Sequence, residues 1–364
     1  MITQLLKGVN QERWIWDRLD SGGNYLADLT AYVSTTQAPE ITHDSTAAVK
    51  RKLKMVIRGD ATLNPLTDLI RPHYQLMMPD GGWIDFVLGT FLLLPTDKNI
   101  SKAQTWRTLD GSDFGQLLVD GAFTNSIGVG PGSVMGAVQS IVASVPGSTP
   151  IQIQMPDPAK QLPVSVGWPA GETRMKAIND LMAAVNYLDV WFDEMGVMQS
   201  SPIPDYTTVT PGFTLDCTTG SGIVKEPIAE RIDMSKAYNQ VLVLMEDPRR
   251  VAISVLYQNI RADSPVSVPN WHPKLQVIRD SRISDIPSAY ARAQTAAQAA
   301  GRVYSEVTLR TFPWAISQHL DVLQLAYSSS DEGTVNAPYL ETKWTHRCQA
   351  GADSTHVVTR IVAA

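Results

Sequence analysis

The chain has 364 residues, of which 44% are hydrophobic and 18% are charged, and its net charge is −6 at pH 7. This length predicts several compact units, because single domains usually have roughly 100 to 200 residues. The composition is that of a globular protein and not of a disordered one. The acidic balance does not favour nucleic-acid binding through phosphate charges.

The N-terminal segment lacks the basic stretch and apolar core of a secretory signal, and no apolar run is long enough to span a membrane. We therefore expect a protein that is made in the cytoplasm and has no membrane segment. Cys217 and Cys348 are the only cysteines. Two cysteines do not make a disulfide framework, so reduced thiols are the simpler expectation. A single disulfide bridge between them is the alternative.

The first part of the chain, residues 1–104, is predicted to be strand-rich. Apolar and β-branched residues are frequent at 25–33, 48–58 and 83–94. Asp80-Gly81-Gly82 separates two such runs and is a strong hairpin signal. This pattern predicts an antiparallel barrel or sandwich.

A dense run of positive charge lies within this first part, at Lys50, Arg51 and Lys52, with Lys54 and Arg58 following. Its alternation with apolar residues predicts the solvated face of a strand. The alternative is a contact with an acidic neighbour in an assembly. Lys50, Arg51 and Lys52 are therefore candidate interface residues.

Residues 105–204 predict an α/β insertion, with helices at 113–119, 133–145 and 173–186. Thr173 can cap the third helix, whose apolar positions recur at three- and four-residue spacing. These positions are Met175, Ile178, Leu181, Met182 and Val185. A strand at 187–192 follows, and Asp193 to Gly196 is a turn with Gly at the positive-φ position, before a return strand.

Residues 205–224 are rich in Pro, Thr, Gly and Ser, which is typical of a linker or an extended crossing strand. Residues 225–364 then predict a strand-rich region, with strands at 238–244, 305–310, 321–327 and 356–362. A long helix is expected at 285–304. Its packed side is predicted to carry Ile286, Tyr290, Ala293, Ala297 and Ala300.

The residues that could carry catalysis or bind a metal do not form a recognised motif. The six histidines are far apart in the sequence, and none pairs at metal-ligand spacing. Gly128 to Gly132 lacks the Lys-Ser/Thr of a phosphate loop, and Asp193-Glu194 lies in a turn instead of facing one site. We therefore predict no catalytic residue, cofactor or metal site, and no enzymatic activity.

Tryptophans are candidate anchors for a partner chain or a glycan, because exposed aromatic rings give large contact areas. Most of the nine are expected in the core. The ones that we single out as candidate interface residues are Trp14, Trp16, Trp83, Trp271 and Trp344.

The order of these segments resembles that of central hub proteins at the tail tip or baseplate of tailed bacteriophages. The resemblance is carried by Ala170 to Thr173, Ile178 to Leu181, Asn186-Tyr187 and Phe192 to Gly196. Further matches follow in order along almost the whole chain. Among them are Leu53 to Ile57, Val87 to Leu93 and Tyr238 to Leu244.

The resemblance implies an α+β fold, mainly of antiparallel β-barrels, with two tube-like domains and an α/β insertion between them. It implies a structural hub in the virion tail tip: a homotrimeric ring that joins the hexameric tail tube to a threefold tip and nucleates tube assembly. Implied partners are a tail tube or distal tail protein, tip, spike or fibre proteins and a tape measure protein, with contact to DNA only during its passage through the lumen. A carbohydrate-binding tail protein is the alternative, and a hub-associated cell-wall hydrolase is a further one.

Overall fold

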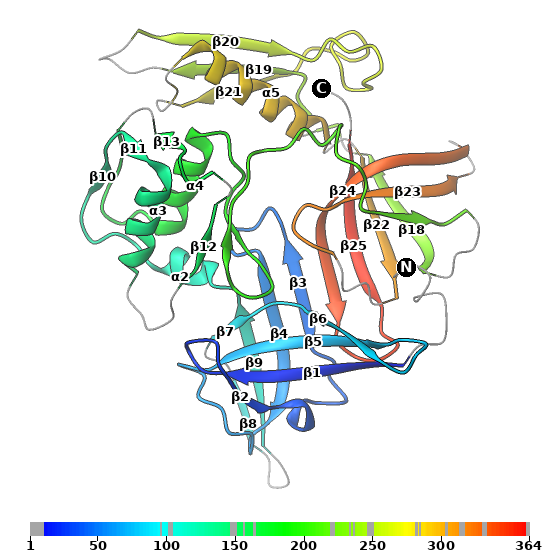
Figure 1. Cartoon of the computed structure of the whole chain (residues 1–364). Coiled ribbons are helices and arrows are strands. Elements are labelled where there is room, and N and C mark those ends of the chain that lie inside the picture. The colour runs from blue at the N-terminus through cyan, green and yellow to red at the C-terminus, as the bar shows by residue number, and fades with distance from the viewer. Residues whose placement is uncertain are drawn as a thin grey trace.

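The computed structural model describes most of the chain. The described residues are 11–94, 97–100, 105–145, 151–155, 157–162, 165–218, 223–232, 234–235, 237–245, 251–280, 283, 285–302, 305–312, 317–329 and 333–361. We divide them into four regions along the chain (Figure 1).

The first strand-rich region spans residues 11–112, and all its strand pairs are antiparallel. Its elements are β1 (Glu12–Leu19), β2 (Tyr25–Asp28), η1 (Thr30–Tyr32), β3 (Glu40–Asp44), β4 (Arg51–Arg58), β5 (Leu69–Met77), β6 (Trp83–Val87), β7 (Phe91–Leu94), β8 (Lys98–Ile100) and β9 (Thr105–Ser112). The predicted hairpin at Asp80 to Gly82 is confirmed, since β5 and β6 pair across it. Alternate residues of β4 are buried, so one face of this sheet covers an apolar core.

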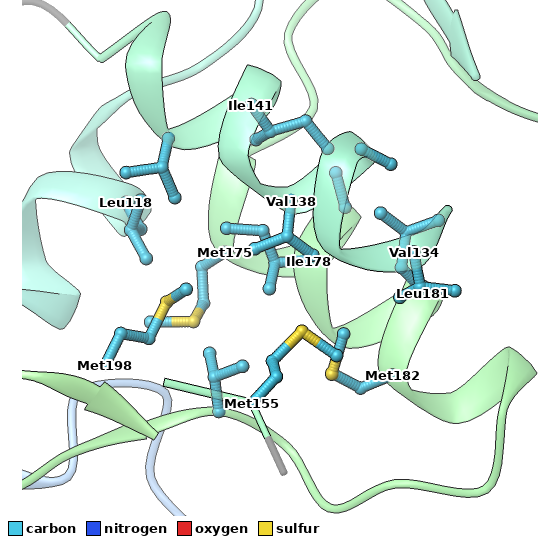
Figure 2. Close-up of a cluster of buried hydrophobic side chains, with 14 of the residues drawn as sticks. Leu118, Val134, Val138, Ile141, Met155, Met175, Ile178, Leu181, Met182 and Met198 are labelled. Atoms are coloured by element: carbon cyan, nitrogen blue, oxygen red, sulfur yellow. The ribbon is translucent and has the colours of Figure 1, made fainter. Parts of the chain in front are cut away.

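The middle region, residues 113–204, packs three helices beside short strands. Its elements are α2 (Gly115–Asp120), β10 (Ile127–Val129), β11 (Gly132–Ser133), α3 (Val134–Ala143), β12 (Ile153–Gln154), β13 (Gln161–Leu162), β14 (Val166–Trp168), α4 (Arg174–Ala184), β15 (Trp191–Phe192) and β16 (Met198–Gln199). The Thr173 side chain accepts a hydrogen bond from the Lys176 N–H, as the sequence predicts for the cap of α4. The five predicted apolar positions of this segment are all buried, and Figure 2 shows Met175, Ile178, Leu181 and Met182 among the side chains of that core.

A small three-stranded sheet lies apart from the other strands and packs on a long helix (Figure 1). The elements are β19 (Gln240–Met245), β20 (Ile253–Gln258), β21 (Leu275–Arg279) and α5 (Ile286–Arg302). The long helix is confirmed. Of its predicted packing residues, Ile286 is wrong, since it is 64% exposed, whereas Tyr290 is 49% exposed but still contacts the Tyr257 ring of β20, with 5.6 Å between centroids. The buried positions are Ala289, Ala293 and Ala297, because the strands approach so closely that alanine fits the contact.

The last strand-rich region contains residues 205–232 and 305–361. Its elements are β17 (Phe213–Asp216), β18 (Val224–Ile232), β22 (Ser305–Thr311), β23 (Val322–Ser329), β24 (Gly333–Arg347) and β25 (Ser354–Arg360). β17 lies within the predicted linker and pairs in parallel with β23. The other pairs within this region are antiparallel and enclose a separate apolar core.

The two strand-rich regions share one 15-stranded sheet, whose main path runs from β18 to β2. The regions meet where β24 pairs with β3, in the register Lys343 to Asp44 through Arg347 to Glu40. The mainly antiparallel β-structure that the sequence predicts is confirmed. Among the described residues, however, no strand pair joins the two ends of this path into a closed barrel.

Candidate functional site

The first, middle and last regions meet at a cluster of buried and half-buried polar and aromatic side chains, which we call the Arg51 junction. It is formed by Arg51 and His43 of the first region, Trp191 and Glu194 of the middle region, and His319 and Trp344 of the last. The junction begins where β3 and β24 pair, so it lies where the shared sheet changes from one region to the other.

Arg51 is a buried cation whose guanidinium group is only partly hydrogen-bonded. Its side chain is 2% exposed, and its Nη2 donates to the Glu194 carboxylate. The Cζ atom lies 5.9 Å from the centroid of the Trp344 ring. Nε and Nη1 of Arg51 have no hydrogen-bond partner among the described residues. Such a cation is costly to bury, and removing Glu194 would take away the one carboxylate that the guanidinium group donates to among the described residues.

The start of β4 is also held by Asp113, which lies two residues before the first residue of α2. Its carboxylate accepts hydrogen bonds from the backbone N–H groups of Arg51, at 2.8 Å, and Gly115, at 2.9 Å. Burial raises the pKa of Asp113 to about 6, against the lowering effect of these hydrogen bonds and of Arg51. Lys50 is buried as well, and its Nζ donates to the Ser45 carbonyl at 2.8 Å.

Aromatic rings connect the three regions at this junction. Trp191 stacks on His319 with 4.6 Å between centroids, and Nδ1 of His319 lies 3.2 Å from Nε2 of His43. His43 stacks in turn on Trp344 at 5.4 Å. One imidazole must donate and the other must accept in the His43–His319 hydrogen bond, so the accepting ring is neutral when it forms. Burial lowers the pKa of His319 to about 3 and that of His43 well below its usual value.

Two further buried histidines extend this arrangement into the last region. His346 stacks on Trp344 at 4.4 Å and has its Nδ1 2.7 Å from the Ser354 hydroxyl. His356 lies between the Glu341 carboxylate, at 2.5 Å, and the Thr311 hydroxyl, at 2.9 Å. Burial lowers the pKa of His346 well below its usual value.

The turn from Asp193 to Gly196 fixes the middle region's side of the junction. The Asp193 carboxylate accepts from the backbone N–H groups of Met195 and Val197, each at 2.9 Å. The Thr90 hydroxyl donates to the Glu194 carbonyl at 3.0 Å. Gly196 has a φ of +82°, and a Cβ there would lie 2.3 Å from the Phe114 ring. Glycine is required for both reasons, as the sequence predicts for the first.

The predicted interface residues divide into two groups. The buried ones pack inside the chain itself and are Trp14, Trp16, Lys50, Arg51 and Trp344. Lys52 is exposed, while Trp83 and Trp271 are half-buried, with Arg13 over the first ring at 4.2 Å and Lys274 near the second at 5.7 Å. Only this second group keeps a side chain available to a partner, and its interface role stays a prediction.

The predicted solvated face of β4 is right for Lys52 and Lys54 but wrong for Arg51. Arg51 shares the odd-numbered face with Leu53, Met55 and Ile57, which are all buried. The alternation itself contained this signal, because side chains two residues apart in a strand point to the same face. His43, Glu194 and His319 gave no comparable signal, since tertiary contacts alone bring them together.

The junction does not resemble a metal centre or an active-site cleft. Within the described residues, no group of three or more His, Cys, Asp and Glu side chains could hold a metal ion. One hollow of about 280 Å³ lies on the shared sheet over Thr345 and Thr355, and another of about 240 Å³ lies beside Arg71 and Gly196. No helix in the described part of the chain has the length and apolarity needed to span a membrane.

Comparison with solved structures identifies the fold. The structure matches a tail protein from Neisseria meningitidis MC58 with a TM-score of 0.67 and 13% identity, over 96% of each chain. It matches the 43 kDa tail protein of prophage MuSo2 from Shewanella oneidensis with a TM-score of 0.62 and 12% identity, over 96% of this chain and 98% of that one. It matches a prophage tail protein from Listeria monocytogenes EGD-e with a TM-score of 0.59 and 9% identity, over 95% and 94%.

Comparisons of the sequence alone find no match, either to a family model or to a curated protein. The structural matches cover nearly the whole length of both partners, so they concern the complete arrangement and not one shared unit. The chain has the fold of phage tail proteins, which confirms the resemblance at the level of fold.

Proposed function

We propose that this protein is the structural hub of a phage tail tip or baseplate. In this proposal three copies form a ring, in which each strand-rich region acts as one tube-like unit. The ring joins the hexameric tail tube on one side to the threefold tip on the other, and it nucleates growth of the tube. It has no enzymatic role.

The observation that carries the proposal is the single sheet that joins the two strand-rich regions. A ring of three chains can match a hexameric tube only if each chain supplies two similar units at a fixed angle. The β3–β24 pairing and the Arg51 junction hold these regions together. Backbone pairing is directional, so it fixes the angle better than a flexible linker would.

The two ends of the sheet path supply surfaces on which the ring can close. β2 is the terminal strand at one end and β18 at the other. On β2, Tyr25 is 61% exposed and Leu26 is 45% exposed. Unpaired strand edges beside exposed apolar side chains favour association with another chain. A head-to-tail contact between the first region of one copy and the last region of the next generates a ring when the rotation closes.

The proposed partners follow from this position in the tail. A tail tube or distal tail protein would contact one face of the ring, and a spike, tip or fibre protein the other. A tape measure protein and DNA would occupy or traverse the lumen. The three tail proteins described above support a tail role, while the ring, its partners and tube nucleation are our proposal.

The experiment is immuno-electron microscopy of phage-like particles from the producing host, with antibody against this chain. We expect label at the distal end of the tail. Light scattering of purified chain, alone and with the tube protein, would then give the mass of the ring. Label along the whole tail, or protein found only free in the lysate, would contradict the hub assignment.

A further inference from the structure

The strongest unexplained feature of the molecule is the mixture of neutral imidazoles and buried charges at the Arg51 junction. The middle region's apolar core contains Leu19 and Leu69 of the first region, but its described members include no residue of the last region. Contact between the middle and last regions at the junction is made by the Trp191–His319 stack. A titratable ring therefore stands where an apolar contact would otherwise be expected.

We propose that the Trp191–His319–His43 stack is an acid-sensitive joint, which holds the middle region against the last strand-rich region at neutral pH and releases it when the imidazoles take up protons. The hydrogen bond between the two rings requires that Nε2 of His43 and Nδ1 of His319 play opposite roles. When both rings are protonated, both atoms are donors and this bond cannot form.

Charged groups lie near the joint on β4, on β24, on the segment before β23 and on the turn from Asp193 to Gly196. Lys50 and Arg51, at the start of β4, oppose protonation of His319. Asp321, two residues along the chain from His319, has Glu194 of the middle region and Glu341 of β24 close enough to raise its pKa. Burial is the largest cause and brings the pKa of Asp321 to about 6.

These groups act in opposite directions on opening. An imidazole with an ordinary pKa in the open state and a pKa of about 3 in the closed state favours opening about 30-fold between pH 7.5 and pH 5. Asp321 opposes this by up to about tenfold if it gains water in the same step, because its raised pKa favours the closed state as pH falls. The effect of the imidazole on the opening equilibrium is larger than that of Asp321, so acid opens the joint.

Hydrogen exchange of the peptide that covers residues 187–199 tests this inference directly. After correction for the intrinsic chemical rate, we expect exchange in the intact chain to rise between about 3-fold and about 30-fold from pH 7.5 to pH 5. His319→Gln keeps a donor and an acceptor but cannot take up a proton in this range. Its corrected exchange should not rise.

The matched control is His73→Gln. His73 lies outside the junction, between the carboxylates of Asp17 and Asp85 on β1 and β6, and this variant should respond to pH as the unaltered chain does. If His319→Gln does not fold, as judged by circular dichroism, His43→Gln replaces it with the same expectation. Corrected exchange that is constant with pH in the unaltered chain, or that rises equally in His319→Gln, would overturn the proposal.

Discussion

The core of the middle region and the Arg51 junction are both buried, but they are stabilised by different physics. The core is built mainly of apolar side chains around α3 and α4, with Met155, Met182 and Met198 among them (Figure 2). The junction contains a buried arginine, neutral histidines and raised carboxyl pKa values. Apolar burial depends little on pH and salt, whereas the His43–His319 hydrogen bond and the Arg51–Glu194 ion pair of the junction depend on protonation states. We therefore expect the core of the middle region to keep its stability when the pH changes, and the Arg51 junction to lose stability in acid.

The largest expected effect lies in the apolar core. Leu181 is fully buried on α4, so Leu181→Ala should lower the free energy of unfolding by about 3 to 5 kcal/mol through lost burial and a residual cavity. The loss should be equal at pH 7.5 and pH 5.5, because no titratable group takes part. Urea unfolding at both values measures it. Leu66→Ala, at a side chain 83% exposed, is the control and should change stability by less than about 0.5 kcal/mol.

If the Leu181→Ala loss differed strongly between the two pH values, the stability of the core would depend on the protonation of the junction. The core and the junction would then not be stabilised independently.

The junction should make the whole chain acid-labile between pH 7 and pH 5. His43, His319 and His346 have lowered pKa values in the folded chain, so only the unfolded chain takes up their protons in this window. The free energy of unfolding therefore decreases as the pH is lowered from 7 to 5. Asp113 and Asp321 have pKa values raised to about 6, so they act with the opposite sign. A histidine that stays neutral in the folded chain costs about 2 kcal/mol over this window and each carboxyl contributes about 1.3 kcal/mol, so the three histidines outweigh the two carboxyls by about 3 kcal/mol.

Urea unfolding at intervals of half a pH unit measures this slope. The triple variant His43→Gln, His319→Gln and His346→Gln should reverse it, because the two carboxyls then act alone. Unchanged stability of the unaltered chain from pH 7 to pH 5 would contradict the assignment of neutral buried imidazoles.

The two regions also differ in how far the sequence predicts them. The α4 segment was predictable because its cap and its apolar spacing are local, and Thr173, Ile178 and Leu181 occupy the predicted places. The junction was not, because His43 and His319 are separated by 276 positions and nothing local indicates their contact. Likewise, the alternation of apolar and polar residues predicts antiparallel strands. It does not predict that β3 pairs with β24 and so merges two expected barrels into one sheet, because tertiary contacts determine that pairing.

A smaller effect is expected when the partner of Arg51 is removed. Glu194→Gln leaves a buried guanidinium without its carboxylate, and a fully buried pair would cost about 3 to 5 kcal/mol. Because the Glu194 side chain is 28% exposed, water can replace part of the interaction, and we expect a loss of about 1 to 3 kcal/mol. Urea unfolding at pH 7.5 measures the loss.

The reciprocal variant sharpens this prediction. Arg51→Met removes the buried charge and leaves a carboxylate that can be hydrated, so it should cost less than Glu194→Gln. The backbone hydrogen bond from residue 51 to Asp113 remains in both variants. Equal losses would mean that the packing of the arginine chain, and not its charge, dominates at this position.

The smallest effect is expected one residue away from Arg51. Lys52 points to the opposite face of β4 and is exposed, so Lys52→Gln should change the free energy of unfolding by less than about 0.5 kcal/mol. Neighbouring residues of equal charge would then differ in effect solely because a strand alternates its faces. Light scattering of this variant with the tube protein tests whether Lys52 is only a solvated side chain of β4 or also contacts an acidic neighbour in the ring. If it makes that contact, Lys52→Gln should weaken assembly without changing the free energy of unfolding. Raising the salt concentration should then weaken assembly of the unaltered chain as well. A loss of stability as large as that of Arg51→Met would instead place Lys52 in the folding core and remove the distinction between the two faces.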